Sequence, residues 1–372
     1  MSGAAKEMIG EHGGGEYGEL LADMIMPSHK PYPSCRFIER AVTFYPGQIT
    51  ACCANPATGL TPLIAPFTGG ELSAEMLLEG RSRIKARHKA GEIVPECRDC
   101  PRLTEDEWSV RQLGEYAIDE VTIAYFSSCN IRCNYCYTVT NPELTAPLSK
   151  APRLLPTFQQ LIERDLLAPY ATVRFSGGEP TLSPEFEQLL VLLTNHGVKS
   201  VVYTNAVKRS EAIIEAIRRD KLELIIGIDA ASVGVYKMIK KMNYNEKVWQ
   251  VTAQYCSALQ PNATNKVWAK FIFCLENYRE AYDFVQRVEA AGARSVYYDF
   301  DASRSRPDTM RAGIGLPEEV SDHVALLRHE CARRGIEVSF AQAGMAWLTP
   351  EREARIDQEF RRLQAGGFSA CV

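Results

Sequence analysis

The chain has 372 residues, of which 46% are apolar and 24% charged, and its formal net charge is −4 at pH 7. This length favours two domains, and no segment reaches the ~20 uncharged apolar residues that a membrane-spanning helix needs. The small acidic excess argues against a broad nucleic-acid-binding face, because neutralising phosphates requires an excess of lysine and arginine. We therefore expect a cytoplasmic protein with neither a nucleic-acid nor a membrane partner.

The first part of the chain differs in composition from the rest. Residues 1–29 are rich in glycine and acidic residues and lack an apolar core, so we expect a flexible lead-in there and not a secretion signal. Residues 30–110 contain many prolines and glycines, short apolar runs and five cysteines. Such a segment cannot build a large core alone, so we expect a small domain that a metal site holds together.

From residue 120 the chain alternates short β-branched or aromatic runs with longer amphipathic stretches, which is typical of parallel βα units. The predicted strands are 120–126, 172–176, 200–204, 222–229, 267–274 and 295–300. The predicted helices are 155–167, 184–196, 210–219, 233–259 with a break near Asn243, and 279–291. A helix from about Pro317 and the run 337–340 are a candidate seventh unit.

Six consecutive βα units with right-handed crossovers curl into an open barrel. The predicted fold class is therefore α/β: a partial (β/α)6 TIM-like barrel over residues 115–345, preceded by the small cysteine-rich domain and followed by a helical tail over 346–372. In such a barrel the chemistry lies at the C-terminal ends of the strands. The unusual residues of this chain do follow the predicted strands: Cys129 to Cys136, Gly177 to Pro180, Asn205, Asp229, Glu276, Asn277 and Asp301.

Three cysteines, Cys129, Cys133 and Cys136, follow the first predicted strand at positions i, i+4 and i+7. Chance would produce this spacing somewhere in such a chain with a probability of roughly 1%. Thiolates select zinc or iron–sulfur clusters. A structural zinc ion is normally closed by four ligands, whereas three cysteines in one tight loop leave a metal position open. The pattern therefore favours an iron–sulfur cluster with one open iron, and zinc is the alternative.

This spacing, with Tyr135 directly before the third cysteine, resembles the signature of the radical S-adenosylmethionine (radical SAM) superfamily over most of residues 120–300. The resemblance implies that Cys129, Cys133 and Cys136 hold a [4Fe-4S] cluster and that S-adenosylmethionine binds its free iron, with Tyr135 near the cofactor. It implies that an electron from the cluster yields a 5′-deoxyadenosyl radical, which abstracts hydrogen from the substrate. It also implies an external electron donor of the flavodoxin or ferredoxin type.

A second motif, Gly177-Gly178-Glu179-Pro180, follows the second predicted strand. Members of the superfamily hold the methionine amino group of the cofactor at this place. Glycines let the backbone approach a ligand closely, and the Glu179 carboxylate can accept hydrogen bonds from an ammonium group. Alone this motif reads as a turn; one βα unit after the cysteines, it supports the resemblance.

Further candidates for contact with the cofactor or the substrate follow later strands. They are Thr204 and Asn205 after the third strand and Asp229 after the fourth. The alternative for each is that it only caps the next helix. Lys270, within the fifth strand, is a weaker candidate that matters if it is buried, because an unpaired lysine inside a barrel is costly.

The upstream cysteines Cys35, Cys52, Cys97 and Cys100 resemble the first half of the pattern in SPASM and twitch auxiliary-cluster domains. Members of the superfamily usually carry that domain after the barrel, and here it precedes it. The resemblance implies one auxiliary [4Fe-4S] cluster on these four thiolates, with Cys53 as an alternative to Cys52, and a structural zinc site is the alternative. The remaining cysteines are expected to be ordinary core or surface residues: Cys256, Cys274, Cys331 and Cys371.

The leading interpretation is an enzyme that oxidises or otherwise modifies a peptide or a small natural product, assisted by the auxiliary cluster. Alternative outcomes are epimerisation, carbon–carbon or thioether bond formation, and methyl transfer. An alternative of another class is a non-catalytic iron–sulfur or zinc protein that serves as a scaffold or electron carrier. The polar residues expected at the barrel mouth carry no pattern diagnostic of a substrate: Asn277, Asp299, Asp301 and Arg304.

Overall fold

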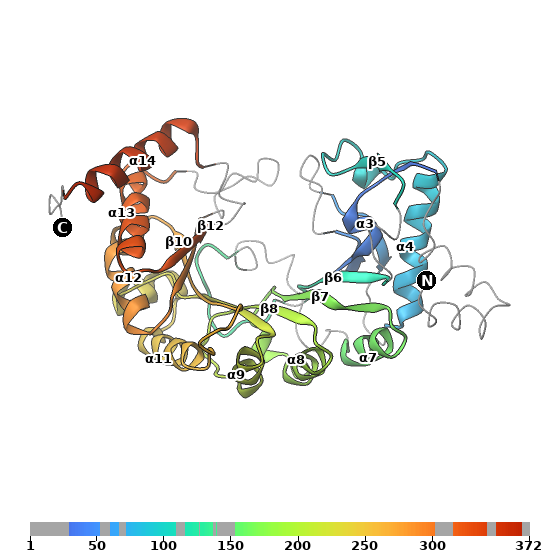
Figure 1. Cartoon of the computed structure of the whole chain (residues 1–372), viewed down its shortest axis with the longest axis horizontal. Helices are drawn as coiled ribbons and strands as arrows, with labels where there is room; N and C mark the ends of the chain where they lie inside the picture. The colour runs from blue at the N-terminus through green and yellow to red at the C-terminus, as the bar shows by residue number, and fades with distance from the viewer. Residues whose placement is uncertain are drawn as a thin grey trace. The chain divides into compact units, whose positions relative to one another are not determined.

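The computed structural model describes residues 30–52, 60–66, 72–108, 116–125, 127–136, 139, 153–301, 315–340 and 347–366. The chain divides into two compact units, which we describe separately. Unit 1 comprises residues 1–127, 146–177 and 184–200, and unit 2 comprises residues 128–145, 178–183 and 201–372. Figure 1 shows both units and labels many of their helices and strands.

Five neighbouring strands of unit 1 lie in the order β7-β6-β2-β3-β4. These strands are β2 (Ala41–Tyr45), β3 (Gln48–Thr50), β4 (Leu63–Pro66), β6 (Ile118–Ile123) and β7 (Leu167–Phe175). β6 pairs in parallel with both β7 and β2, whereas β2, β3 and β4 are antiparallel neighbours. The turn between β2 and β3 is Pro46-Gly47, where Gly47 has a φ of 77° that glycine adopts without a steric penalty. A separate ribbon pairs β1 (Tyr32–Ser34) with β5 (Thr104–Asp106).

The helices of unit 1 are α3 (Arg36–Arg40), α4 (Ala74–Lys89), α7 (Leu155–Glu163), α8 (Phe186–Asn195) and the 3₁₀ turn η1 (Pro95–Cys97). α4 begins after Ser73, whose hydroxyl accepts from the Met76 N–H and so caps the helix. α7 and α8 bury Phe158 and Phe186, whose rings lie 6.4 Å from Phe44 and 5.3 Å from Phe175 of the sheet. Aromatic contacts therefore attach both helices to the strands.

The pairing of β2 with β6 is a feature that the sequence did not predict. It places β2, β3 and β4 in one sheet with the strand predicted to open the barrel. Residues 41–44 of β2 are all buried, so the segment lacks the alternation of apolar and polar residues that marks a half-exposed strand. The predicted boundaries of a small domain over 30–110 remain a prediction.

A buried charged group holds α3, α4 and β1 together in unit 1. The Glu39 carboxylate pairs with Lys85 Nζ at 2.7 Å and accepts from the hydroxyls of Tyr32 and Ser34. Burial alone would raise the pKa of Glu39, but Lys85 and the two hydroxyls outweigh burial and hold that pKa below its ordinary value. Arg81, fully buried on α4, donates to main-chain carbonyls beside this pair.

The substitution Lys85→Met should destabilise the protein by about 3–5 kcal/mol, because it leaves the Glu39 carboxylate buried and unpaired. Urea unfolding would measure this loss. The matched control is Arg87→Met on the same helix, which removes an exposed pair with Glu92 and should change the unfolding midpoint far less. Equal effects of the two substitutions would contradict this account of the pair.

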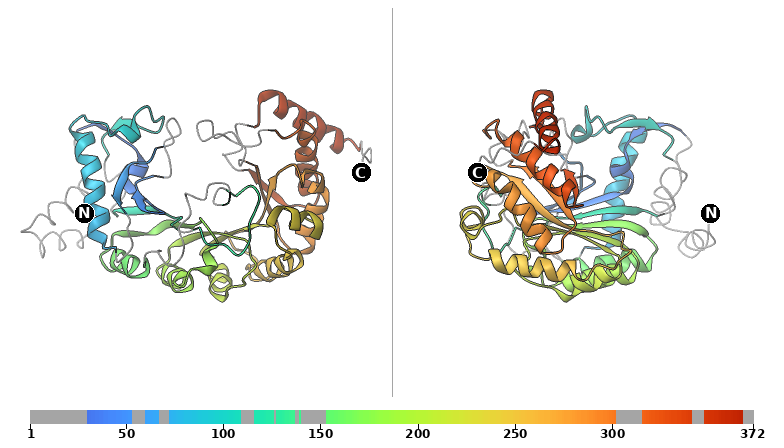
Figure 2. Two further views of the ribbon diagram at one scale, coloured as in Figure 1. Left: turned by 180° about the vertical axis from the view of Figure 1, so that it is seen from behind. Right: turned by 60° about the vertical axis from the view of Figure 1, so that its left-hand side comes forward.

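Unit 2 contains strands in the order β12-β11-β10-β9-β8. Its strands are β8 (Lys199–Thr204, whose first two residues belong to unit 1), β9 (Leu222–Gly227), β10 (Val267–Phe273), β11 (Ser295–Phe300) and β12 (Glu337–Phe340). Its helices and 3₁₀ turns are η4 (Pro180–Leu182), α9 (Glu211–Arg218), α10 (Val233–Lys240), α11 (Asn245–Cys256), η5 (Tyr278–Glu280), α12 (Ala281–Ala290), α13 (Val320–Arg333) and α14 (Pro350–Gln364). Figure 2 shows α9, α11, α12 and α13 along one side of these strands.

The alternating strands and helices confirm the predicted α/β class. The predicted break in the long helix lies between α10 and α11, where Lys241 adopts a left-handed φ of 60° and its N–H closes α10 on Lys237. The candidate seventh unit is present as α13 and β12. Among the helices that the structure describes, none is long and apolar enough to cross a membrane.

The two faces of the sheet in unit 2 differ. From β10, Phe271 packs on Phe284 of α12 with ring centroids 4.6 Å apart. Side chains alternate along a strand, so the neighbouring Trp268 and Lys270 belong to the other face, which we call the inner face. Its apolar part is a cluster of Val201, Ile225 and Trp268 with Tyr203 and Tyr297 packed against it.

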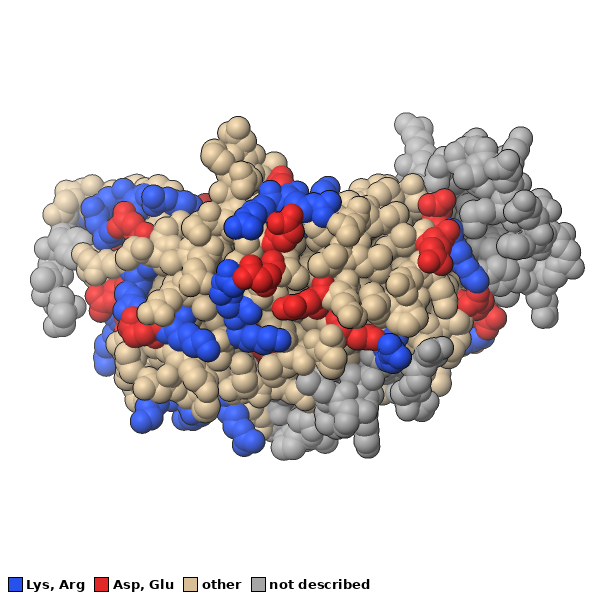
Figure 3. Space-filling model, turned by 90° about the horizontal axis from the view of Figure 1, so that it is seen from below, with Lys and Arg blue, Asp and Glu red and all other residues tan. Residues whose placement is uncertain are grey.

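Charged side chains on the outer surface are interleaved by sign. Figure 3 shows Lys and Arg next to Asp and Glu on the face that it draws, without a continuous stripe of either sign among the described residues there. Pairs of this kind within unit 2 include Arg287 with Glu246 and Arg209 with Glu211. Such exposed pairs add little to stability.

Candidate functional site

The cysteine loop, residues 128–136, is anchored in unit 2 by main-chain hydrogen bonds. The N–H groups of Arg132 and Asn134 donate to the last two carbonyls of α10, at 3.1 and 2.9 Å. The carbonyl of Ser128 accepts from the N–H of Glu179 at 2.9 Å. The loop therefore uses the carbonyls that the end of a helix leaves without partners.

The three thiols of this loop influence one another. Burial raises the pKa of the Cys129 thiol to about 11, with Glu179 and Cys133 contributing to the rise. Burial also raises the pKa of Cys133, with contributions from Asp229 and Cys136 that Lys240 opposes. Thiols that suppress one another's ionisation fit a metal site, because a bound cation replaces their protons and relieves the crowding of charge.

The structure describes no group of three or more His, Cys, Asp or Glu side chains that is already arranged to hold a metal ion. The fit of an iron–sulfur cluster to Cys129, Cys133 and Cys136 therefore rests on the thiolate donors and on the placement of their loop. Three thiolates would hold three irons of a four-iron cube and leave the fourth iron open.

Glu179 is buried, and its carboxylate is fully engaged by the protein. One oxygen accepts from the hydroxyls of Thr181 and Thr204 at 2.7 and 2.8 Å, and the other accepts from the N–H of Asn205 at 2.7 Å. Burial raises the pKa of Glu179, and these donors oppose the rise. In this structure Glu179 ties its own turn to the end of β8, and its predicted contact with the cofactor ammonium group remains a prediction.

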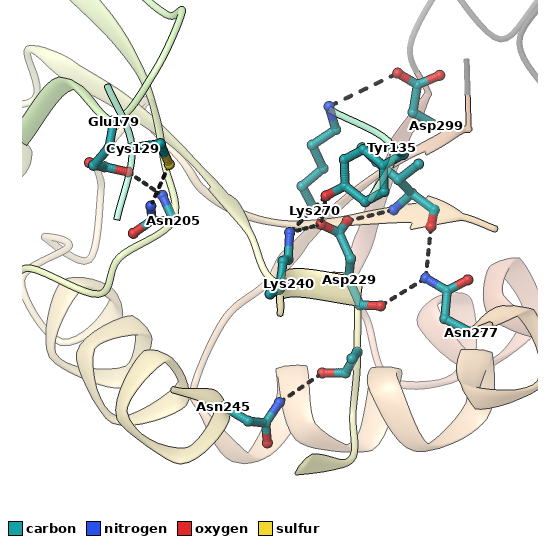
Figure 4. Close-up of polar contacts among 12 residues, drawn as sticks. Cys129, Tyr135, Glu179, Asn205, Asp229, Lys240, Asn245, Lys270, Asn277 and Asp299 are labelled. Carbon is teal, nitrogen blue, oxygen red and sulfur yellow. Dashed lines mark hydrogen bonds and ion pairs between the residues drawn. The ribbon is translucent and has the colours of Figure 1, made fainter. Parts of the chain in front are cut away.

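Asn205 connects the Glu179 turn to the cysteine loop, as Figure 4 shows. Its side-chain amide donates to Asn130 Oδ1 at 2.6 Å and to Cys129 Sγ at 3.5 Å. Its side-chain oxygen accepts from the N–H of Val207 at 2.9 Å. The structure thus brings together Cys129, Glu179 and Asn205, which lie in three separate segments of the sequence.

Asp229 follows β9 with a left-handed φ of 61°, and it is fully buried. Its Oδ1 accepts from the N–H of Ile272 at 2.7 Å, and its Oδ2 accepts from the Tyr135 hydroxyl and pairs with Lys240. Lys240 Nζ also donates to the Tyr135 hydroxyl at 2.7 Å. Asp229, predicted to contact cofactor or substrate, therefore has both oxygens occupied by protein groups (Figure 4).

Lys240 is the residue of this site that sequence reasoning missed. It lies in a run with Lys237 and Lys241 that reads as a solvated helix face, yet its side chain is only 2% exposed. The buried residues of α10 are Tyr236, Ile239 and Lys240, at a spacing of three and four residues. That helical period could have placed Lys240 on the buried side.

Asn277 and Asp299, two of the polar residues expected at the barrel mouth, differ from each other in where their side chains lie. Asn277 is buried and donates to the carbonyls of Asp229 and Ile272 at 2.8 and 2.7 Å, so it braces the strand ends. Asp299 lies on the inner face with its Oδ2 4.0 Å from Lys270 Nζ. Burial raises the pKa of Asp299, and Lys270 opposes that rise. Arg304 lies outside the described residues.

In unit 1, two of the predicted auxiliary ligands, Cys35 and Cys100, are near enough to Cys97 to oppose its ionisation. Burial raises the pKa of Cys97 to about 12, and Cys35 and Cys100 raise it further. The N–H of Cys100 donates to the Cys97 carbonyl at 3.2 Å, so the two form one turn. Cys52 follows β3, and Cys53 lies outside the described residues. The thiol chemistry at Cys35, Cys97 and Cys100 fits a metal site as the cysteine loop does.

The substitution Asn205→Ala should loosen the cysteine loop, because Asn130 Oδ1 and Cys129 Sγ lose their donor. A lost partner of this kind costs about 1–3 kcal/mol. Hydrogen exchange of the metal-free protein would show faster exchange over residues 128–136 and unchanged exchange over β9. Unchanged protection of the loop would contradict the anchoring role of Asn205.

Comparisons with known proteins bear on this site. Residues 123–268 match the family model of the Radical SAM superfamily. The antilisterial bacteriocin subtilosin biosynthesis protein AlbA of Bacillus subtilis is 23% identical over 184 residues, which are 48% of this chain and 39% of AlbA. GTP 3′,8-cyclase of Chlorobaculum tepidum is 31% identical over 106 residues, which are 27% of this chain and 30% of the cyclase. The chain therefore spans less than half the length of either curated relative.

Among solved structures, SuiB of Streptococcus suis superposes with a TM-score of 0.48 and 12% identity, covering 74% of this chain and 56% of SuiB. Native anSMEcpe with bound AdoMet superposes with a TM-score of 0.42 and 14% identity, covering 59% of this chain and 63% of anSMEcpe. The family match spans the cysteine loop, Glu179, Asn205 and Lys240. Residues 123–268, which carry these side chains, therefore match the radical SAM superfamily, whose enzymes use a [4Fe-4S] cluster and S-adenosylmethionine.

Proposed function

We propose that this protein cleaves S-adenosylmethionine reductively at a [4Fe-4S] cluster held by Cys129, Cys133 and Cys136, and modifies a peptide substrate by hydrogen abstraction. The observation that carries the proposal is the cysteine loop itself, which carries three thiols and whose main chain is bonded to α10 and to the Glu179 turn. When bound, the cluster and its cofactor supply the electron and the 5′-deoxyadenosyl radical.

The protein residues around the cluster position the cofactor. Glu179 acts through Thr204 and Asn205, because it accepts hydrogen bonds from both and so fixes the end of β8. Thr204 and Asn205 are proposed to meet the ribose or carboxylate of S-adenosylmethionine. The backbone of Gly177 and Gly178 would lie along its methionine part, where the absence of side chains permits close approach.

The substrate is proposed to lie on the inner face of unit 2. That face combines an apolar base at Ile225 and Trp268 with the aromatic side chain of Tyr297 and the Lys270–Asp299 pair. Apolar walls with a few polar groups are typical of sites for organic ligands. The similarity to AlbA, a bacteriocin biosynthesis protein, favours a peptide over another small natural product.

An auxiliary [4Fe-4S] cluster is proposed on Cys35, Cys52, Cys97 and Cys100. The grouping of Cys35, Cys97 and Cys100 supports it. This cluster would accept the electron that the substrate radical loses when it is oxidised, or would help to bind the substrate. An external flavodoxin or ferredoxin would supply the electron for cofactor cleavage. The cytoplasm suits this chemistry, because its redox buffers keep thiols reduced.

Alanine substitution of Cys129, Cys133 or Cys136 should abolish formation of 5′-deoxyadenosine from S-adenosylmethionine with dithionite. The reason is that each thiolate would hold one iron of the cluster. Anaerobic reconstitution followed by chromatography measures the product. Cys331→Ala, which removes a buried cysteine of α13, is the control and should keep full turnover. A fully loaded wild-type protein that yields no 5′-deoxyadenosine would contradict the proposed function.

Alanine substitution of Cys97 or Cys100 should remove about four of about eight irons per chain, as two cubane clusters require. It should spare the formation of 5′-deoxyadenosine more than the formation of modified product. Iron and sulfide analysis beside the cleavage assay measures both effects. Four irons and one zinc in the wild-type protein would instead show a structural role for the upstream cysteines.

A further inference from the structure

Lys240 is a buried charged residue, and the stability of the fold does not by itself require a charge at this position. Its side chain is 2% exposed and that of its partner Asp229 is 0% exposed. Burial lowers the pKa of Lys240, but Asp229 and Cys133 outweigh burial and raise that pKa above its ordinary value, so the side chain is an ammonium ion. A buried ion pair is often no more stabilising than apolar residues of the same size, so the pair calls for another explanation.

Lys240 contacts the cysteine loop by its main chain and by its side chain. Its carbonyl accepts from the N–H of Arg132 at 3.1 Å, just before Cys133. Its Nζ donates to the hydroxyl of Tyr135 at 2.7 Å, between Cys133 and Cys136, and lies 5.2 Å from the centre of that ring. One residue therefore holds the loop on both sides of Cys133.

The charged groups of this pair also meet the cysteine loop between two of its proposed ligands. Tyr135 lies two residues after Cys133 and one before Cys136, and its hydroxyl contacts both Lys240 Nζ and the Asp229 carboxylate. The positive and the negative charge of the pair therefore both lie at the cysteine loop.

We propose that Lys240 is a positioning residue that raises the reduction potential of the cluster on Cys129, Cys133 and Cys136, and that Asp229 moderates this effect. The inference rests on the proposed function of these cysteines. A fixed positive charge beside a ligating sulfur stabilises the cluster after it has gained an electron, and net charge and hydrogen bonds near the sulfurs are what set such potentials. Asp229 keeps the lysine in place and offsets part of its field.

The test is a redox titration of the reconstituted protein, monitored by electron paramagnetic resonance in the absence of S-adenosylmethionine. Lys240→Met should make reduction at least tenfold less favourable, a shift of at least 59 mV toward negative potential for a one-electron couple. Asp229→Asn should shift the potential toward positive values, and asparagine tolerates the left-handed backbone of this position. Lys237→Met, on the exposed side of the same helix, is the control and should leave the potential unchanged.

An unchanged or more positive potential in Lys240→Met, with iron content equal to the wild type, would overturn the proposal. If Lys240→Met fails to hold its irons, Lys240→Arg and Asp229→Asn decide the question. Lys240→Arg keeps the charge and should stay close to the wild-type potential, and a negative or absent shift in Asp229→Asn would overturn the proposal. A wild-type protein that binds no cluster at this loop would contradict the proposed function, whereas a bound cluster that is insensitive to these substitutions contradicts only the role of Lys240.

Discussion

The Asp229 carboxylate is where separate segments of unit 2 meet. It accepts from Ile272 on β10 and from Tyr135 in the cysteine loop, and it pairs with Lys240 at the end of α10. Its own carbonyl accepts from Asn277. A carboxylate is costly to bury unless several donors of this kind satisfy its oxygens. The strand ends, the helix and the loop are therefore held by one set of mutually dependent contacts, and removing one member would leave the others buried with fewer partners.

Unit 1 contains a comparable arrangement. Glu39, Lys85 and Arg81 are buried together, and Arg81 donates to the main-chain carbonyls of Ala41 and Ala117. In both units a buried ion pair joins a helix to segments distant in sequence, and in both a neighbouring hydroxyl completes the contacts of the carboxylate. These pairs specify which segments lie together more than they add to the free energy of unfolding.

The strands from β8 onward could be predicted because each is a short apolar run followed by a helical period. β7 begins earlier in the chain than the sequence predicts. Its first residues were not predicted as a strand because they include Pro169, and proline argues against a strand. β2 was missed because its partner β6 lies more than seventy residues away, and no local pattern reveals such pairing. Because β2 is buried on both faces, its sequence also lacks the alternation of apolar and polar residues that marks a half-exposed strand.

The candidate site also has features that the sequence pattern reveals and features that depend on contacts between distant segments. Cys129, Glu179, Asn205 and Asp229 could be found because polar residues after parallel strands lie at one edge of the sheet. What those residues contact could not be found, because it depends on side-chain directions. Glu179 and Asp229 looked like groups that face a ligand, and their oxygens are taken by protein donors. Lys240 looked like a surface lysine, and only three-dimensional packing shows that it is buried.

The anchoring of the cysteine loop has a consequence for how changes elsewhere in unit 2 reach the proposed metal ligands. Residues 128–136 are bonded to α10, to the Glu179 turn, to Asn205 and to Asp229. A substitution at any of these four places can therefore displace the thiols without altering a cysteine.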